Sequence, residues 1–194
     1  MKKLLFFSFL AFSCILNAQT LTYEVVTGKN YLGEIIVMHI ESKENQTLKI
    51  NAVGNISFHL FKLINLNYEL NTVFKAGELY YSSVIIYING KEHSRTMTEQ
   101  KGEHYTISKD AKSTLYLKNI IYSGSLLYFK EPVGILKIFS EFDGFEKQVK
   151  KSGVHHYQVI NAKNGQISEY YYNEGILQEA IIHHPLMSFK IILK

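Results

Sequence analysis

Apolar and polar side chains alternate along most of this chain in short runs separated by turn residues. From Leu21 onward the runs are rich in β-branched and aromatic residues, which favour strands. No stretch keeps the i, i+3, i+4, i+7 spacing of an amphipathic helix over three turns. The pattern therefore predicts a mainly β protein, an antiparallel meander of about ten to twelve long coiled strands.

Turn signals between the runs mark the expected hairpins. Each signal contains a residue that tolerates a positive φ angle, and an Asn-Gly pair suits both central positions of a type I′ turn. The expected turns are Gly28–Asn30, Ala76–Gly77, Asn89–Gly90, Lys101–Gly102, Ser152–Gly153, Asn164–Gly165 and Glu174–Gly175.

Several predicted strands are apolar on both faces, and Glu34–Ile40 is an example. A sheet with one wet face would alternate cleanly, so such strands need cover on both sides. A strongly curved half-barrel or open barrel provides that cover. The charged runs Lys91–Gly102 and Phe145–Lys151 have the composition of edge strands or exposed hairpins.

The stretch Ile121–Gly134 departs from the β pattern. A Ser-Gly-Ser opening leads into four apolar residues, and Pro132 follows. We expect Ser123–Lys130 to form one short helical plug, with Ser123 or Ser125 as its N-cap. Its apolar side chains would face the concave side of the sheet, either as a permanent plug or as part of a ligand site. The candidate ligand-binding residues are Tyr122, Leu126, Leu127, Tyr128 and Phe129.

The N-terminus has the order of a secretory signal peptide. Lys2 and Lys3 precede the apolar run Leu4–Leu16, which is shorter than the roughly 20 residues of a membrane span. We expect residues 1–18 to be removed, leaving 19–194 as a single β domain in the periplasm. Lipidation of Cys14 is the alternative, with a membrane anchor as its consequence.

Composition narrows the classes of function. Removal of residues 1–18 takes away two of the 21 basic residues and leaves 19 against 17 acidic ones. With Arg95 as the single arginine, nucleic acid is a poor partner. Without Cys14 the mature chain contains no cysteine, which excludes disulfides and thiolate chemistry. We expect no cofactor.

The sequence contains residue types that bind metals or catalyse hydrolysis, but their spacing does not match such sites. The two His-His pairs place neighbouring rings on opposite faces of a strand, so we expect no metal site. The acids that could serve a hydrolase are Glu131, Glu141, Asp143 and Glu146. Ser123-Gly124-Ser125 lacks the Gly-x-Ser-x-Gly nucleophile pattern.

The segments Tyr122–Gly134, Phe139–Glu141 and Tyr170–Gly175 resemble an uncharacterised family of small exported bacterial β-proteins, known as a domain of unknown function. The resemblance extends over the mature chain and implies structural rather than catalytic motifs. The predicted architecture is also similar, more remotely, to the half-barrels of periplasmic lipoprotein carriers, which hold acyl chains.

Three classes of function follow. The favoured one is a non-enzymatic protein that binds an apolar or amphipathic molecule in the concave face of the sheet. The alternative is a scaffold with a filled core whose strand edges meet a protein partner. A hydrolase is the least favoured. An outer-membrane barrel would be the competing architecture, but the charged run Lys91–Gly102 lies where spanning strands are required.

The export prediction is tested at the N-terminus of the mature protein. Mass spectrometry of protein recovered from the periplasm should find Gln19 as the first residue. A lipid-modified Cys14, or an intact Met1, would contradict cleavage after Ala18.

Overall fold

The computed structural model describes residues 16–59, 61–183 and 187–194, so most of the predicted signal peptide, with Cys14, lies outside the described residues. The described part contains fourteen strands and one 3₁₀ turn. In chain order they are β1 (Leu16–Thr27), β2 (Asn30–Ser42), β3 (Thr47–His59), β4 (Leu63–Lys75), β5 (Glu78–Ile88), β6 (Lys91–Lys101), β7 (His104–Lys109), β8 (Lys112–Tyr116), η1 (Gly124–Tyr128), β9 (Lys137–Ser140), β10 (Phe145–Gly153), β11 (His156–Ile160), β12 (Ile167–Asn173), β13 (Ile176–His183) and β14 (Ser188–Leu193).

All fourteen strands belong to one antiparallel sheet with the order β8-β7-β6-β5-β4-β3-β2-β1-β14-β13-β12-β11-β10-β9. The first strand therefore lies in the middle, where it pairs with β2 along its length and with β14 over Tyr23–Val26. The sheet stays open between β8 and β9. The predicted open, antiparallel, mainly β fold is confirmed, with fourteen strands instead of about ten to twelve, several of them short.

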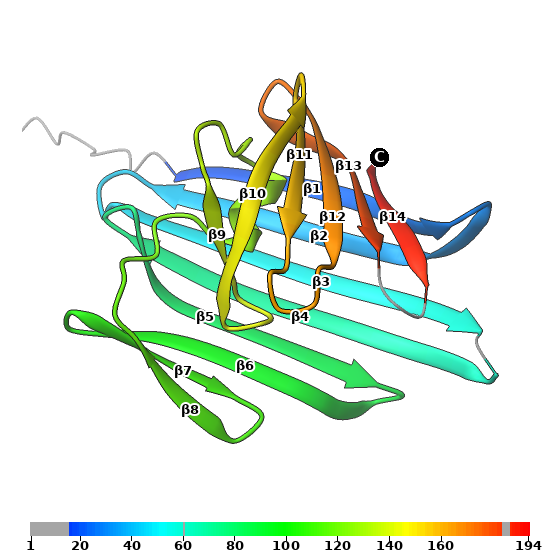
Figure 1. Cartoon of the computed structure of the whole chain (residues 1–194), viewed down its shortest axis with the longest axis horizontal. Coiled ribbons are helices and arrows are strands. Elements are labelled where there is room, and N and C mark those ends of the chain that lie inside the picture. The colour runs from blue at the N-terminus through cyan, green and yellow to red at the C-terminus, as the bar shows by residue number, and fades with distance from the viewer. Residues whose placement is uncertain (1–15, 60, 184–186) are drawn as a thin grey trace, which may run out of the picture.

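The sheet folds over itself into two layers (Figure 1). Long strands β1 to β6 form a broad layer, and β10 to β14 cross in front of it at a steep angle. The apolar side chains between the layers form the core. Its most deeply buried members include Tyr23, Val25, Val37, Ile50, Leu79, Val84, Tyr105 and Leu177.

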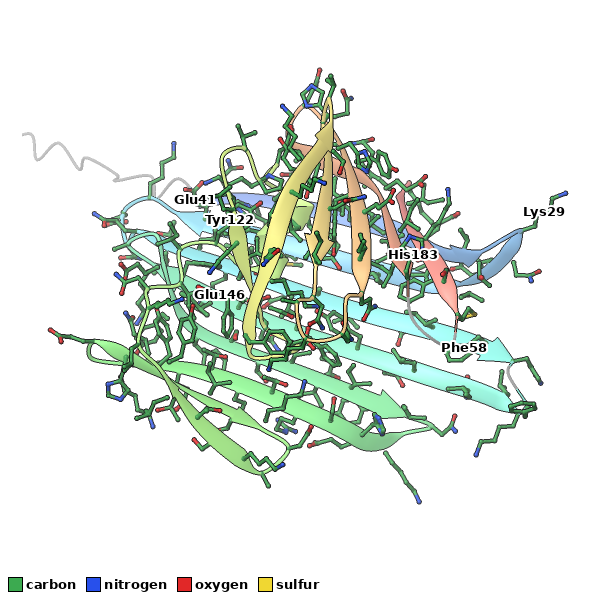
Figure 2. The ribbon with its side chains drawn as sticks, viewed as in Figure 1. Lys29, Glu41, Phe58, Tyr122, Glu146 and His183 are labelled. Carbon is green, nitrogen blue, oxygen red and sulfur yellow. The ribbon has the colours of Figure 1, made fainter. Side chains whose placement is uncertain are left out.

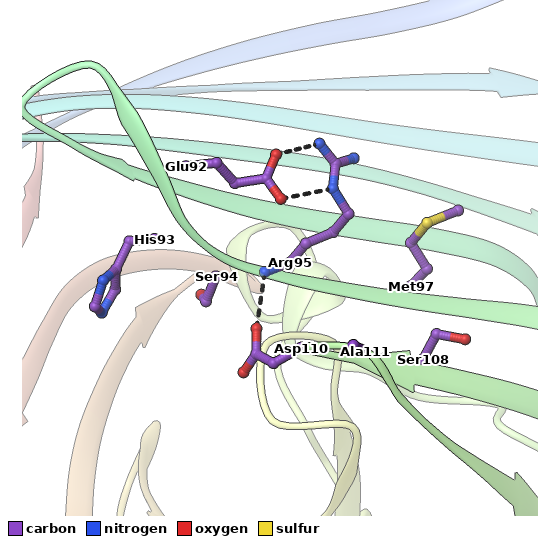
Figure 3. A pocket seen from close by; sticks show the side chains of 8 residues that line it. All are labelled: Glu92, His93, Ser94, Arg95, Met97, Ser108, Asp110 and Ala111. Carbon is purple, nitrogen blue, oxygen red and sulfur yellow. Dashed lines mark hydrogen bonds and ion pairs between the residues drawn. The ribbon is translucent and has the colours of Figure 1, made fainter.

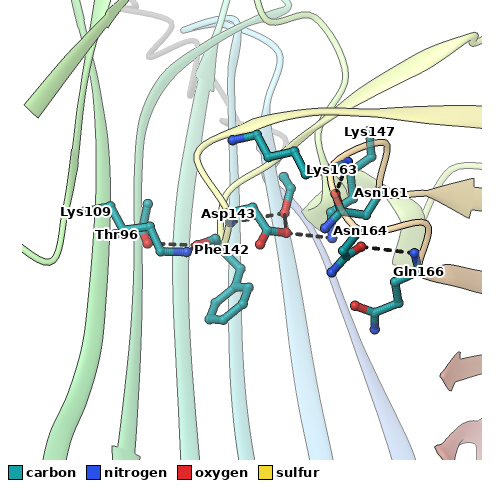
Figure 4. Close-up of polar contacts among 10 residues, drawn as sticks. Thr96, Lys109, Phe142, Asp143, Lys147, Asn161, Lys163, Asn164 and Gln166 are labelled. Carbon is teal, nitrogen blue, oxygen red and sulfur yellow. Dashed lines mark hydrogen bonds and ion pairs between the residues drawn. The ribbon is translucent and has the colours of Figure 1, made fainter. Parts of the chain in front are cut away.

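Side chains close the gap between the two ends of the sheet. The Tyr116 hydroxyl on β8 donates to Glu146 Oε1 on β10 at 2.6 Å, and Lys118 and Lys137 both pair with Oε2 at 3.3 Å. Further along, Thr96 Oγ1 and Lys109 Nζ each donate to the carbonyl of Phe142 at 2.8 Å (Figure 4). Polar side chains therefore bridge the opening between β8 and β9, where the two edge strands have no backbone pairing.

Two expectations about strand faces and edges are corrected. On β2, Ile35 and Val37 are buried, but Ile36 and Met38 face outward and remain 46% and 40% exposed. The outer face is thus uncovered, and an apolar residue there reflects strand propensity. The charged strands β6 and β10 are not edges either, because each has a neighbour on both sides.

The turn chemistry is mostly as predicted. Asn89 and Gly90 both have positive φ, of 52° and 77°, as a type I′ turn requires. At Asn164–Gly165 only the glycine has a positive φ, of 72°, so this pair does not form the expected type I′ turn. At Ser152–Gly153, Gly153 ends β10 and the turn follows at His155, whose φ is 53°. Gly33 has a different role: a Cβ there would lie 1.9 Å from the Asn55 carbonyl oxygen, so only glycine lets the two strands approach.

Three neighbouring strands carry a row of buried hydroxyl groups. Thr72 on β4 pairs in register with Ser82 on β5, which pairs with Thr98 on β6. Each residue is at most 1% exposed, and no described residue offers its hydroxyl a hydrogen-bond partner. Burying such a group without a partner costs free energy, so the row destabilises the fold.

Thr98→Val should therefore raise the free energy of unfolding by about 1 kcal/mol, because it removes an unpaired hydroxyl at nearly constant shape. Thr96→Val is the matched control on the same face of β6. It removes the hydrogen bond to Phe142 and should cost about 1 kcal/mol. Urea unfolding of both variants measures the two changes in the free energy of unfolding. Equal destabilisation by Thr98→Val and Thr96→Val would contradict the absence of a hydrogen-bond partner for the Thr98 hydroxyl.

Candidate functional site

The single helical element of the described chain lies on the segment that connects β8 to β9. In this segment, buried Ile120 accepts a hydrogen bond from Leu79 N at 2.8 Å, and buried Tyr122 accepts one from Phe139 N at 3.0 Å. The 3₁₀ turn η1 follows, at the position where the sequence predicts a plug. Ser123 occupies the N-cap position, but its hydroxyl makes no capping bond, since it donates to Glu141 instead.

The turn η1 separates two spaces, and the predicted site residues divide between them. Leu127 and Tyr128 line an interior cavity of about 170 Å³. Leu126 and Phe129 line a groove of about 670 Å³ at one end of the molecule. Tyr122 lines neither, because it is buried and its hydroxyl donates to the Lys130 carbonyl. The five predicted residues therefore do not form one site.

The end groove lies between η1 and the hairpin ends of β2, β3 and β4, on the side where Figure 2 labels Glu41. Its apolar wall combines buried Phe74 and Leu126 with half-buried Leu48 and Phe129. The Phe129 ring packs on His39 with the centroids 4.9 Å apart. Burial lowers the pKa of His39, so the neutral imidazole is favoured beside this wall.

Charged side chains surround the mouth of the end groove. Glu41, Lys43 and Lys130 line it, and both lysines are exposed. The end groove thus has an apolar interior and a polar rim that carries more positive than negative charge.

The interior cavity lies between the two layers and has mostly apolar walls. Three tyrosines approach the carboxyl group of Glu141: Tyr68 from β4, Tyr128 from η1 and Tyr170 from β12. Burial and, to a smaller extent, the charge of Glu141 together raise the pKa of Tyr128 to about 12. Burial and Glu141 also raise the pKa of Tyr68 and Tyr170. All three hydroxyls therefore stay protonated at neutral pH.

Glu141 is the buried acid of this cavity, with 4% of its surface exposed. Its Oε1 accepts hydrogen bonds from the Ser123 hydroxyl and from Ser125 N, the latter at 3.0 Å. The Ser123 and Ser125 hydroxyls are also bonded to each other at 3.1 Å. One carboxylate oxygen is thus fixed to the start of η1.

Glu131 forms a second acid cluster on the other side of the connecting segment. It accepts hydrogen bonds from the Tyr157 hydroxyl at 2.7 Å and lies 2.9 Å from His155 Nδ1. Burial alone would raise the pKa of Glu131, but the contacts with Tyr157 and His155 outweigh it and lower the pKa. No serine hydroxyl contacts the His155 ring in the described chain, so the cluster is not a serine–histidine pair.

A third space lies on the outer face beside β6 and holds about 400 Å³ (Figure 3). The Arg95 guanidinium donates hydrogen bonds there to both oxygens of Glu92, at 3.1 and 2.6 Å, so this acid balances its charge. Among the described residues, no three His, Cys, Asp or Glu side chains come together as metal ligands would. No helix in the described part is long and apolar enough to cross a membrane.

Sequence reasoning missed several residues that line the two spaces beside η1. Leu48 and Phe74 reach the end groove from β3 and β4, and Tyr68 and Tyr170 reach the interior cavity from β4 and β12. No local signal identifies them, because strand register decides which side chains meet. Glu141 was considered as one of four acids, but its pairing with Ser123 spans 18 residues.

Three comparisons with known proteins bear on the chain. The family model for a domain of unknown function (DUF6134) matches residues 23–194. The solved structure of a β-barrel-like protein with the domain of unknown function DUF1849, from Brucella abortus, is similar with a TM-score of 0.61 and 12% sequence identity. The match covers 94% of this chain and 98% of that one, and at this identity it shows the fold alone. A search of curated proteins finds no match.

The contacts of Glu131 predict that the free energy of unfolding decreases as the pH falls. Since the folded state lowers the pKa of Glu131, its contribution is present at neutral pH and is lost as the pH falls below the ordinary value of 4.5. Glu131→Gln should therefore unfold more easily at pH 7, by about 1 to 3 kcal/mol, and lose less stability on acidification.

Urea unfolding at pH 7 and at several lower pH values measures this dependence. Tyr157→Phe removes one of the two contacts of Glu131. Its free energy of unfolding should depend on pH more weakly than that of the wild type and more strongly than that of Glu131→Gln. An acid dependence that is identical in wild type and Glu131→Gln would contradict the linkage.

Proposed function

The chain belongs to the DUF6134 family, and from this premise we propose that it is a non-enzymatic binding protein that holds an amphipathic molecule in its end groove. The observation that carries the proposal is the volume of that groove, about 670 Å³, beside the predicted plug. Ligand sites in proteins commonly measure about 300 to 1,000 Å³. A scaffold with a filled core, the alternative function, does not require such a space.

The lining of the end groove supports a ligand with two chemical parts. An alkyl chain would bury its surface against Leu48, Phe74, Leu126 and Phe129. A charged head would lie at the rim, where Lys43 and Lys130 outnumber Glu41. An anionic head, such as a fatty carboxylate, fits this balance of charge.

The proposal includes a location. The N-terminal residues carry the pattern of a signal peptide, so we place the function outside the cytoplasm, in the periplasm. Lipidation at Cys14 is the alternative, and it would bring the same groove close to a membrane surface.

Binding of a dansyl-labelled undecanoic acid tests the proposal by fluorescence titration. Leu48→Trp fills the end groove with a larger side chain and should raise the Kd at least about tenfold. Leu63→Trp is the matched control, because Leu63 is 49% exposed at the far end of β4, near Phe58 in Figure 2.

The control variant should bind as the wild type does. Equal affinity of wild type and Leu48→Trp, or no binding by the wild type, would overturn the end groove as the site. Native mass spectrometry of the purified protein would add the mass of any amphiphile that it retains.

A further inference from the structure

We propose that the interior cavity is a second binding site, which takes a small organic cation: a primary ammonium group on a compact apolar or aromatic body. The inference rests on the cavity around Glu141 and is independent of the proposed function of the end groove.

The size of the cavity sets the class of molecule. Its volume is about 170 Å³, a quarter of that of the end groove. An engineered cavity of about 150 Å³ in another protein binds benzene. A molecule of the size of one aromatic ring with a short substituent therefore fits, whereas a long alkyl chain does not.

The walls favour an apolar body. They come from seven strands, from η1 and from the turn between β9 and β10, so both layers of the sheet contribute to the space. Phe142, which is 40% exposed, stands where the lining reaches solvent and marks the entrance. The aliphatic side chains of the wall are Leu70, Leu127, Ile138, Val159, Leu177, Ala180, Ile182 and Ile191.

The charge inside the cavity is negative and unbalanced. Glu141 has no lysine, arginine or histidine nitrogen within ion-pair distance among the described residues. Lys147 also lines the cavity, but its Nζ pairs with Asp143 Oδ2 at 2.6 Å. A buried carboxylate without a countercharge is costly, and a bound cation would remove that cost.

One oxygen of Glu141 is held and the other is left for a ligand. The Ser123 hydroxyl and Ser125 N bind Oε1, whereas no described residue donates a hydrogen bond to Oε2. Oε2 lies above Gly124, where a Cβ would come within 2.9 Å of it. The carboxylate is thus fixed in advance with one acceptor open, an arrangement suited to an ammonium donor.

The tyrosines add to the preference for a cation. Tyr68, Tyr128 and Tyr170 line the same cavity, and the face of a tyrosine ring attracts a cation. Their protonated hydroxyls can also donate or accept hydrogen bonds. An anionic ligand would instead meet Glu141 without compensation, so anions should be excluded.

Calorimetry with benzylamine and benzyl alcohol at pH 7 tests the site, because the two probes have the same size and differ in charge. Wild type should bind benzylamine at least about tenfold more tightly than benzyl alcohol. Glu141→Gln keeps the shape and a hydrogen-bond acceptor but removes the charge. It should reduce the preference to within about twofold.

Three further variants sharpen the test. Glu131→Gln removes a different buried charge, outside the cavity, and should keep the preference for benzylamine. Gly124→Ala should weaken benzylamine binding at least about threefold, because its Cβ displaces Oε2. Leu48→Trp fills the end groove alone and should leave benzylamine affinity unchanged, which separates this site from the proposed function.

The outcomes decide the proposal even if Glu141→Gln fails to fold. Wild type that binds neither probe, or both equally, overturns it. A preference for benzylamine that survives Glu141→Gln also overturns it. Nuclear Overhauser contacts from the benzylamine ring to Leu127 and Tyr170 would support the location, and contacts confined to Leu48 and Phe129 would overturn it.

Discussion

The backbone pairing between β1 and β14 is the constraint on which the two-layer arrangement depends. It joins the first and last strands over Tyr23–Val26, so these two strands lie side by side in the middle of the sheet. In the sheet order, β13 to β9 follow β14 on the side away from β1, and this part of the sheet folds over the long strands (Figure 1). The Tyr23 hydroxyl strengthens the junction by donating to the Leu177 carbonyl at 3.1 Å. The family match begins at Tyr23, the residue at which this pairing begins.

Once the sheet has this shape, the connection from β8 to β9 has to cross the space between the two edges. A strand there would need partners on both sides, and the segment instead forms a short 3₁₀ turn. Successive side chains of such a turn point in different directions. Leu126 and Phe129 therefore face the end groove while Leu127 and Tyr128 face the interior cavity, and movement of η1 would change both spaces.

Local chemistry explains what the sequence could predict. Asn89–Gly90 specifies its own turn, and the Ser-Gly-Ser opening with its apolar block marks η1. Register is not local, so the meeting of Ser123 with Glu141 could not be predicted. The charged composition of β6 is typical of an edge strand, yet its alternation places Thr96 and Thr98 inward while Arg95 faces out. The composition of the run does not show which of its residues face inward.

Polar burial by itself does not identify a binding site in this protein. The hydroxyls of Thr72, Ser82 and Thr98 have no partner among the described residues, but almost none of their surface is accessible, so neither water nor a ligand can reach them. Glu141 is equally buried as a residue, yet it lines an open volume. The row of hydroxyl groups only lowers the stability of the fold. Glu141, in contrast, combines a charge that has no ion-pair partner in the described part of the chain with space for a cationic group that would pair with it.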